Sequence, residues 1–486
     1  MKYIKNVMAN KDSKKILVVG LLQLVILLVI FPIIIYACNS LPWADDFTNS
    51  YANFPEAVGL KLKYYFVPAC RKVIYTYING GGYYFVIFAN FLISPFLRGG
   101  ITGIRIANCC INIFFFSSAY VFFYKFTRRV LEGNLLLANV FYCAFVVVLV
   151  NAYMNSEVYT QYVVLIAYVM PVGLLFVLLS VMISEQWKGR YLVLAVLAFL
   201  LGGSPLNVAA LVCGLVFIIG ILEWIVFGRK FEFIISFSMA IIGSLVNVLS
   251  PGNYIRHDYT VEGYDVLDSL IQTINVVVES ILTKITNIPL MAIMLFVALV
   301  ILSEVRYESF KVKFNYPLLC TLTVVIGIVI VDFPVFFGVG QIFDRGIYIQ
   351  DITTYILGFF WMVYIIGFFK EKAISIRQVD KWMYCVFVMG FLFVALNMHE
   401  KFECTTFYMW DSLFSGKLKE CVRNQEQIMN MTEKSQEKDV VVYLDEEIDN
   451  VFFDSLGSDS TYYYNYTVAG YYGKESLKVF YYESVD

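Results

Sequence analysis

The sequence has little charge and almost no histidine. Only 15% of its 486 residues are charged, two are histidine, and its ten cysteines include no Cys-x-x-Cys pair. The low charge excludes an ordinary water-soluble domain, and the scarcity of histidine and paired cysteine argues against a zinc site. A net charge of −2 argues against a nucleic-acid partner.

Most of the sequence is apolar. They make up 60% of the chain, aromatic residues make up 17%, and the mean hydropathy is +0.71. This composition is typical of a polytopic membrane protein. We therefore expect an all-α fold of about eleven transmembrane helices in the lipid bilayer. The expected spans are 16–38, 101–124, 134–152, 161–183, 190–203, 206–227, 231–249, 288–303, 317–337, 347–369 and 382–398.

Basic clusters recur between these spans and predict their orientation. By the positive-inside rule the clusters face the cytoplasm, which places the N-terminus there and the alternate turns outside. The first apolar run is longer than the apolar region of a signal peptide, so we count it as a helix. The clusters lie at 11–15, 125–129, 188–190, 229–230, 306–313 and 370–381, and the outer turns at 39–100, 153–160, 204–205, 250–287 and 338–346.

The segment 83–97 is apolar but short. Counting it as a crossing would move every later basic cluster outside, so we expect it to be re-entrant or interfacial. The rest of the outer loop 39–100 mixes aromatic and basic residues, which suits helices in the headgroup layer.

The composition changes after residue 398. We expect a transmembrane domain over 1–398 and a small α/β unit over 399–486, which an odd number of crossings places outside the cell. Its predicted elements are an amphipathic helix at 418–436 and strands at 439–444 and 477–482. A disulfide between two of the outer cysteines is left open, and these are Cys38, Cys70, Cys404 and Cys421.

Two polar motifs fall on the predicted outer face. Asp45 and Asp46 follow the first span, and Pro251-Gly252-Asn253 with Arg256 follows a later one. Two neighbouring aspartates repel each other and are costly to desolvate at a membrane surface, so their presence indicates chemistry. We expect the two loops to meet in one outward cavity, as a base and an anion-binding group.

These motifs resemble the GT-C superfamily of polyprenyl-phosphate-dependent membrane glycosyltransferases, and more narrowly an uncharacterised bacterial family of GT-C-like proteins. The narrower resemblance also covers Asn79-Gly80, Asn108, Arg345 and Tyr464-Asn465 with Tyr471-Tyr472-Gly473. It implies transfer of a sugar from a polyprenyl-phosphate-linked donor to a cell-surface glycan or lipid acceptor, at the outer face of the bacterial plasma membrane. Gly81 stands where that family usually has arginine.

The resemblance implies roles for the polar residues. Asp45 or Asp46 would be the base, although Asp46 could instead cap a helix. Arg256, Arg345 and Asn253 would bind the donor phosphate. For Arg256 the alternative is contact with lipid headgroups, and for Arg345 it is an ion pair with Asp344.

Glu157 and Tyr159 would bind the sugar or the acceptor, although an aromatic belt explains the tyrosine equally well. No cofactor is predicted, and a divalent cation is left open. The alternative functions are a flippase or transporter of lipid-linked saccharides, and a polymerase. A coupled transporter would place charge in mid-membrane, whereas Glu223 and Asp332 lie near the ends of the predicted spans.

Overall fold

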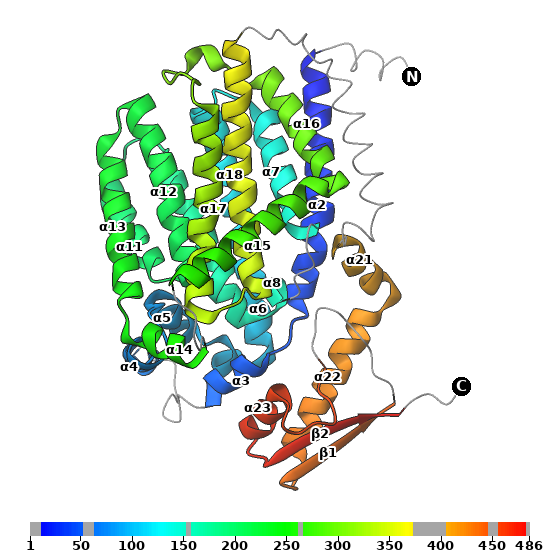
Figure 1. The fold of residues 1–486 in the computed structure, drawn as a ribbon. Coiled ribbons are helices and arrows are strands. Elements are labelled where there is room, and N and C mark those ends of the chain that lie inside the picture. The colour runs from blue at the N-terminus through cyan, green and yellow to red at the C-terminus, as the bar shows by residue number, and fades with distance from the viewer. Residues whose placement is uncertain are drawn as a thin grey trace, which may run out of the picture.

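The computed structural model describes residues 11–51, 63–151, 157–260, 266–372, 405–445 and 455–482. Helices dominate this part of the chain, and its single sheet has two strands (Figure 1). Eight helical segments are long and apolar enough to cross a membrane, so the prediction of a multi-pass helical membrane protein is confirmed. They are α2 (Lys11–Cys38), α6 (Pro95–Arg129), α9 (Tyr162–Val164) with η1 (Leu165–Val169) and α10 (Met170–Met182), α12 (Leu206–Phe227), α13 (Lys230–Val248), α15 (Val266–Thr286), α17 (Pro317–Val339) and α18 (Asp344–Glu371).

The predicted count of eleven crossings is not reproduced in the described residues. Four further apolar helices are shorter than 18 residues: α5 (Tyr84–Ile93), α7 (Leu135–Asn151), α11 (Arg190–Gly202) and α16 (Ile288–Glu304). The predicted span 382–398 lies outside the described residues. The predicted outer turn at 250–287 instead contains α15, which runs obliquely across the neighbouring helices (Figure 1).

The helix α7 forms the centre of the bundle. Every residue from Leu136 to Asn151 is buried, as expected for a helix that is apolar on all sides. Phenylalanines from α6 and α10 pack against Phe145 of α7, with ring centroids 5.3 Å away for Phe123 and 5.8 Å away for Phe176. This aromatic core fixes α6, α7 and α10 against one another.

One end of the bundle gathers the short helices α3 (Ala44–Tyr51), α4 (Lys63–Asn79), α5 and α14 (Pro251–Thr260), at the bottom of Figure 1. The ten residues of α5 reach roughly 15 Å, about half of a bilayer core. This length agrees with the expected re-entrant or interfacial segment. Ser94 then takes a left-handed conformation with φ of 36°, and α6 begins at Pro95.

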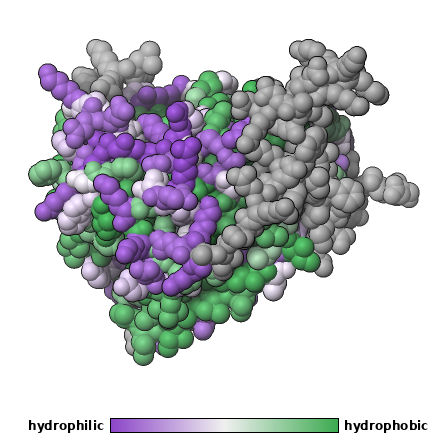
Figure 2. Space-filling view, turned by 90° about the horizontal axis from the view of Figure 1, so that it is seen from above, coloured by the Kyte–Doolittle hydropathy of each residue, from purple (hydrophilic) through white to green (hydrophobic). Residues whose placement is uncertain are grey.

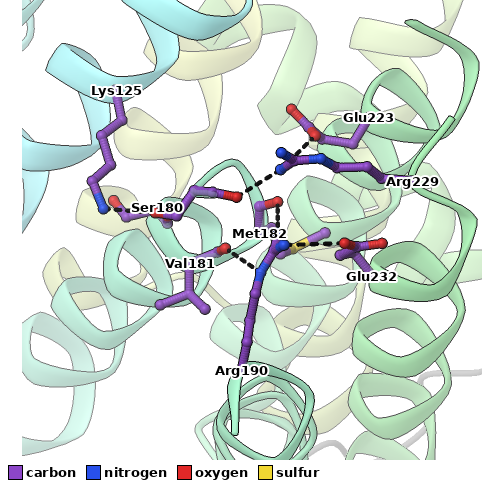
Figure 3. Close-up of polar contacts among 9 residues, drawn as sticks. Lys125, Ser180, Val181, Met182, Arg190, Glu223, Arg229 and Glu232 are labelled. Carbon is purple, nitrogen blue, oxygen red and sulfur yellow. Dashed lines mark hydrogen bonds and ion pairs between the residues drawn. The ribbon is translucent and has the colours of Figure 1, made fainter. Parts of the chain in front are cut away.

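The opposite end of the bundle is held by buried ion pairs (Figure 3). The Arg190 guanidinium lies 3.0 Å from Glu232, and both side chains are about 1–2% exposed. Arg229 lies 3.4 Å from Glu223. The arginines of two predicted cytoplasmic clusters therefore join helices instead of being fully solvated. Figure 2, which views this end, shows hydrophilic side chains over much of the face and hydrophobic ones along its flank.

The remaining short elements at that end are α16 and η2 (Tyr307–Ser309), which precede α17. The Tyr307 hydroxyl is buried against α18 and donates to the carbonyl of Val363 at 2.9 Å. This contact ties the connection between α16 and α17 to the bundle.

The C-terminal unit contains α21 (Thr405–Ser415), α22 (Lys417–Lys434), β1 (Asp439–Leu444), α23 (Tyr463–Tyr471) and β2 (Ser476–Tyr481). β1 and β2 pair in parallel, with Asp439 opposite Ser476. Helix α22 and both strands lie where the sequence predicts them. Tyr464, Asn465 and Tyr471 of the late motif lie on α23, a helix that the sequence did not predict.

The C-terminal unit docks on the helix bundle through polar contacts. Arg105 of α6 lies 2.8 Å from Glu426 of α22. The indole N–H of Trp410 donates to the carbonyl of Leu28 in α2 at 2.9 Å. Two helices of the unit thus contact the bundle.

No disulfide joins two of the described cysteines. Among the four predicted outer cysteines, Cys38, Cys70 and Cys421 form no disulfide, and Cys404 lies outside the described residues. The sulfur of Cys38 instead lies 3.5 Å from that of Cys109 in α6. The spacing of the outer cysteines along the chain did not indicate this neighbour.

We predict that the C-terminal unit and the Lys188 turn face opposite sides of the membrane. Val441 is 44% exposed on β1, whereas its neighbour Val440 is buried, so Val441→Cys is the better probe. An impermeant maleimide added to intact cells should label Val441→Cys and should label Lys188→Cys only after permeabilisation. The parental protein controls for its native thiols, and the reverse pattern would overturn the orientation.

Candidate functional site

A cavity of about 530 Å³ lies where α3, α4, α5 and α14 gather. This volume is within the range of ligand sites, roughly 300–1,000 Å³. The end of α17, the start of α18 and the short helix α8 (Glu157–Thr160) complete the wall. Five predicted site residues line it: Asp45, Glu157, Asn253, Arg256 and Arg345.

Asp45 is the predicted base that reaches the cavity. It is the second residue of α3, is partly exposed, and its Oδ1 accepts a hydrogen bond from the Tyr463 hydroxyl at 3.0 Å. Tyr463 is the first residue of α23, so the C-terminal unit supplies a partner to the membrane domain. A carboxylate placed in this way can accept a proton from a bound hydroxyl.

Aromatic packing fixes α3 beside α23. The Tyr464 hydroxyl donates to the carbonyl of Pro42 at 2.9 Å, and its ring lies 4.8 Å from that of Trp43. Phe47 packs edge-on against Tyr471 at 5.3 Å. The tyrosines of the late motif thus position the loop that carries Asp45.

Asp46 has a different role from its neighbour. It is 3% exposed, does not line the cavity, and accepts a hydrogen bond from the Trp43 N–H at 2.8 Å. This bond satisfies a donor at the start of α3, as the third residue of a capping box does. Burial raises the pKa of its carboxyl to about 7; the Trp43 bond opposes this rise, and Asp45 adds to it. The structure therefore favours the capping role for Asp46.

Two turns approach closely beside the cavity. Residues 79–82 pack against Pro251-Gly252-Asn253, and a Cβ on Gly252 would lie 2.4 Å from the nitrogen of Gly81. The N–H of Gly82 donates to Asn253 Oδ1 at 3.1 Å, and Asn253 Nδ2 donates to the carbonyl of Asn247 at 2.7 Å. Asn253 lines the cavity, but its amide is engaged in joining the turns.

Arg256 follows Asn253 by three positions on α14. Residues three apart share a helix face, and both line the cavity. Arg256 is exposed, so its guanidinium can reach a ligand in solvent. The docked turns set the direction of α14, and through it the position of Arg256.

Arg345 and Glu157 form a pair in the cavity wall. The guanidinium of Arg345 lies 3.8 Å from Glu157 Oε2, and both side chains are about one third exposed. Burial raises the pKa of the Glu157 carboxyl, Arg345 lowers it, and Asp344 and Asp45 raise it. Asp45 and Glu157 therefore lie close enough for their charges to interact.

Tyr159, predicted to bind sugar, does not line the cavity. It is 1% exposed, and its ring packs edge-on against Tyr348 at 6.2 Å. Although it is two positions after Glu157, it points into the helix core. The sequence could not separate the two positions because both lie in one short polar and aromatic stretch.

The structure adds two residues to the cavity. Lys72 of α4 lines it, and burial lowers the pKa of its ammonium. His257 lines it as well, with Nδ1 2.6 Å from the carbonyl of Phe337 and its ring stacked on that side chain. The basic residues of the predicted interfacial helix were the only sequence signal for Lys72.

The cavity combines two carboxylates with three basic side chains. Asp45 and Glu157 supply the first, and Lys72, Arg256 and Arg345 supply the second. Such a set can take a proton from a hydroxyl and hold an anionic group beside it. Within the described residues, no group of three or more His, Cys, Asp or Glu side chains could hold a metal ion.

No protein-family model matches the chain, and no curated protein matches its sequence.

We predict that Asp46 makes stability depend on pH. Its pKa is 3.8 in the unfolded chain and about 7 when folded, so folding takes up a proton between these values. Stability should fall as pH rises through this window, because the folded state binds more protons than the unfolded state. Asp46→Asn should make the dependence less steep, measured as the thermal unfolding midpoint in detergent. Asp411→Asn, an exposed control on α21, should keep the parental slope; an unchanged slope in Asp46→Asn would refute the assignment.

Proposed function

We propose that this protein is a GT-C-type membrane glycosyltransferase. It transfers a sugar from a polyprenyl-phosphate-linked donor to a cell-surface glycan or lipid acceptor on the outer face of the bacterial plasma membrane. One observation carries the proposal: Asp45, Arg256 and Arg345 come from three distant segments and line one cavity. A reaction centre requires such a gathering of groups around the reacting atoms.

The chemistry assigns a role to each side of the cavity. The Asp45 carboxylate accepts the proton of the acceptor hydroxyl, which then attacks the anomeric carbon of the donor sugar. Negative charge develops on the departing phosphate, and Arg256 and Arg345 stabilise it. Lys72 adds a third positive charge to the same wall.

Glu157 contributes both to phosphate binding and to sugar binding in this mechanism. Its ion pair with Arg345 orients the guanidinium, and its second oxygen can accept a hydrogen bond from a sugar hydroxyl. The sequence offered an ion pair with Asp344 as the alternative role of Arg345. Because Glu157 already pairs with Arg345, that ion pair is not required to hold the arginine in the cavity wall.

A flippase or transporter of lipid-linked saccharides is the second candidate. It is favoured by Asp332, Asp351 and Lys284, which lie in helices long enough to span the membrane. The sequence placed Asp332 near the end of its span, but in α17 its carboxyl is buried and accepts a hydrogen bond from Gln350 of α18. Intramembrane charges of this kind are typical of coupled transporters. A donor that crosses proteoliposome membranes without any sugar transfer would support this candidate.

We predict that Asp45→Asn lowers the rate of sugar transfer by about 10²–10⁴, because the amide cannot accept a proton. Donor binding should persist, because the shape is kept. The measurement is transfer from a polyprenyl-phosphate-linked sugar in nanodiscs, alongside donor binding. Asp258→Asn, an exposed position on α14, is the control and should retain parental activity. Transfer by Asp45→Asn at the parental rate would exclude this carboxylate as the base.

We predict that Arg256→Lys weakens donor binding and turnover together. Lysine keeps the charge but loses the two-pronged contact with phosphate. Donor titration and initial rates measure the two effects, with Arg423→Lys on the exposed face of α22 as the matched control. Equal donor affinity in parent and Arg256→Lys would place the phosphate elsewhere.

A further inference from the structure

A second polar cluster lies inside the helix bundle. Asp332 of α17 and Asp351 of α18 are 0% and 4% exposed, and neither lines the cavity. The ammonium of Lys284, near the end of α15, lies 2.8 Å from Asp351 Oδ1. The side-chain amide of Gln350 donates to Asp332 Oδ2 at 2.6 Å. The roles proposed for the cavity leave this cluster without a function.

The charges of this cluster do not balance. It contains two carboxyl groups and one ammonium, and Gln350 is a neutral donor. An uncompensated charge is strongly destabilising in a buried, low-dielectric position. Asp332 Oδ1 is buried and has no hydrogen-bond partner among the described residues. One further positive charge at this oxygen would neutralise the cluster.

Two buried tyrosines interact electrostatically with Asp351, and one of them, Tyr355, follows it by four positions on α18. The charge of Asp351 acts on the side chains of both Tyr159 and Tyr355. Neither hydroxyl has a hydrogen-bond partner in the part of the chain that the structure describes. Carboxylate and hydroxyl oxygens are the ligands that small hard cations prefer.

We propose that Asp332 and Asp351 bind one small monovalent cation, Na⁺ or a proton, beside the Lys284 ammonium. A single positive charge makes the cluster neutral, whereas a divalent ion would leave it positive. This site does not depend on the glycosyltransferase proposal, because it shares no residue with the cavity.

The helix that carries Lys284 suits such a site. The apolar side chains of Leu267, Ile274 and Leu282 on α15 are exposed, and α15 crosses its neighbours obliquely (Figure 1). Lys284 also donates to Ser280 Oγ at 2.5 Å, so it has a second partner on its own helix. Lys284 is thus a tethered cation on a lightly packed element, and it competes with a free cation for the same carboxylates.

Thermal unfolding in detergent tests the proposal without any activity assay. In one arm NaCl replaces choline chloride at constant ionic strength and alkaline pH; in the other, the pH is lowered in choline chloride alone. Binding to the folded state alone raises the unfolding midpoint. A rise in the first arm identifies Na⁺, and a rise only in the second identifies the proton. The second arm uses the Asp46→Asn background, because Asp46 has a pH dependence of its own.

Asp332→Asn should abolish the Na⁺ response of the parent, or the proton response of the Asp46→Asn background, and Asp411→Asn should keep it. In the proton arm the groups that act on Asp332 are Gln350, Lys284 and Asp351, and Lys284 is the only cation among them, so Lys284→Met is the second variant. Removing the tethered cation should lower the half-saturating Na⁺ or proton concentration by about tenfold or more. A parent that responds to neither cation, or a Lys284→Met variant with an unchanged midpoint concentration, would overturn the site. This second variant also keeps the test decisive if Asp332→Asn does not fold.

Discussion

The contact between two glycine turns is the constraint on which the cavity depends. A Cβ on Gly82 would lie 1.9 Å from the carbonyl oxygen of Asn247, and Gly252 is equally confined by the turn at 79–82. Only backbone fits at this crossing, so the end of α4 and the start of α14 are held at a fixed separation. Lys72 and Arg256 reach the cavity from these two helices, and their spacing follows from the backbone contact.

The two adjacent aspartates have different roles because they lie in the first turn of a helix. Successive side chains on a helix point about 100° apart. On α3 this rotation turns Asp45 toward the cavity and Asp46 into the protein, where it accepts the Trp43 N–H. The sequence predicts that the two aspartates repel each other and are costly to desolvate. Both effects raise the pKa of Asp46, and desolvation is the larger of the two.

Much of this arrangement could be predicted from local patterns. Hydropathy located most of the helical segments, alternation located β1 and β2, and the two polar motifs identified Asp45, Asn253 and Arg256 in the cavity wall. The predictions that failed concern residues whose surroundings are formed by distant segments of the chain. Tyr159 is buried because Tyr348 packs against it, and α15 was missed because polar positions such as Ser269 and Thr273 interrupt its apolar run. The cluster of Lys284, Asp332 and Asp351 was likewise invisible, since three separate helices bring it together.

The hydrogen bond between Tyr463 and Asp45 joins residues 418 positions apart. A ribosome makes the aspartate early and the tyrosine almost last, so the two can meet only after every intervening helix has been inserted and α23 has folded. Until then the carboxylate has no tyrosine beside it. The order of synthesis thus makes this hydrogen bond one of the last contacts of Asp45 to form.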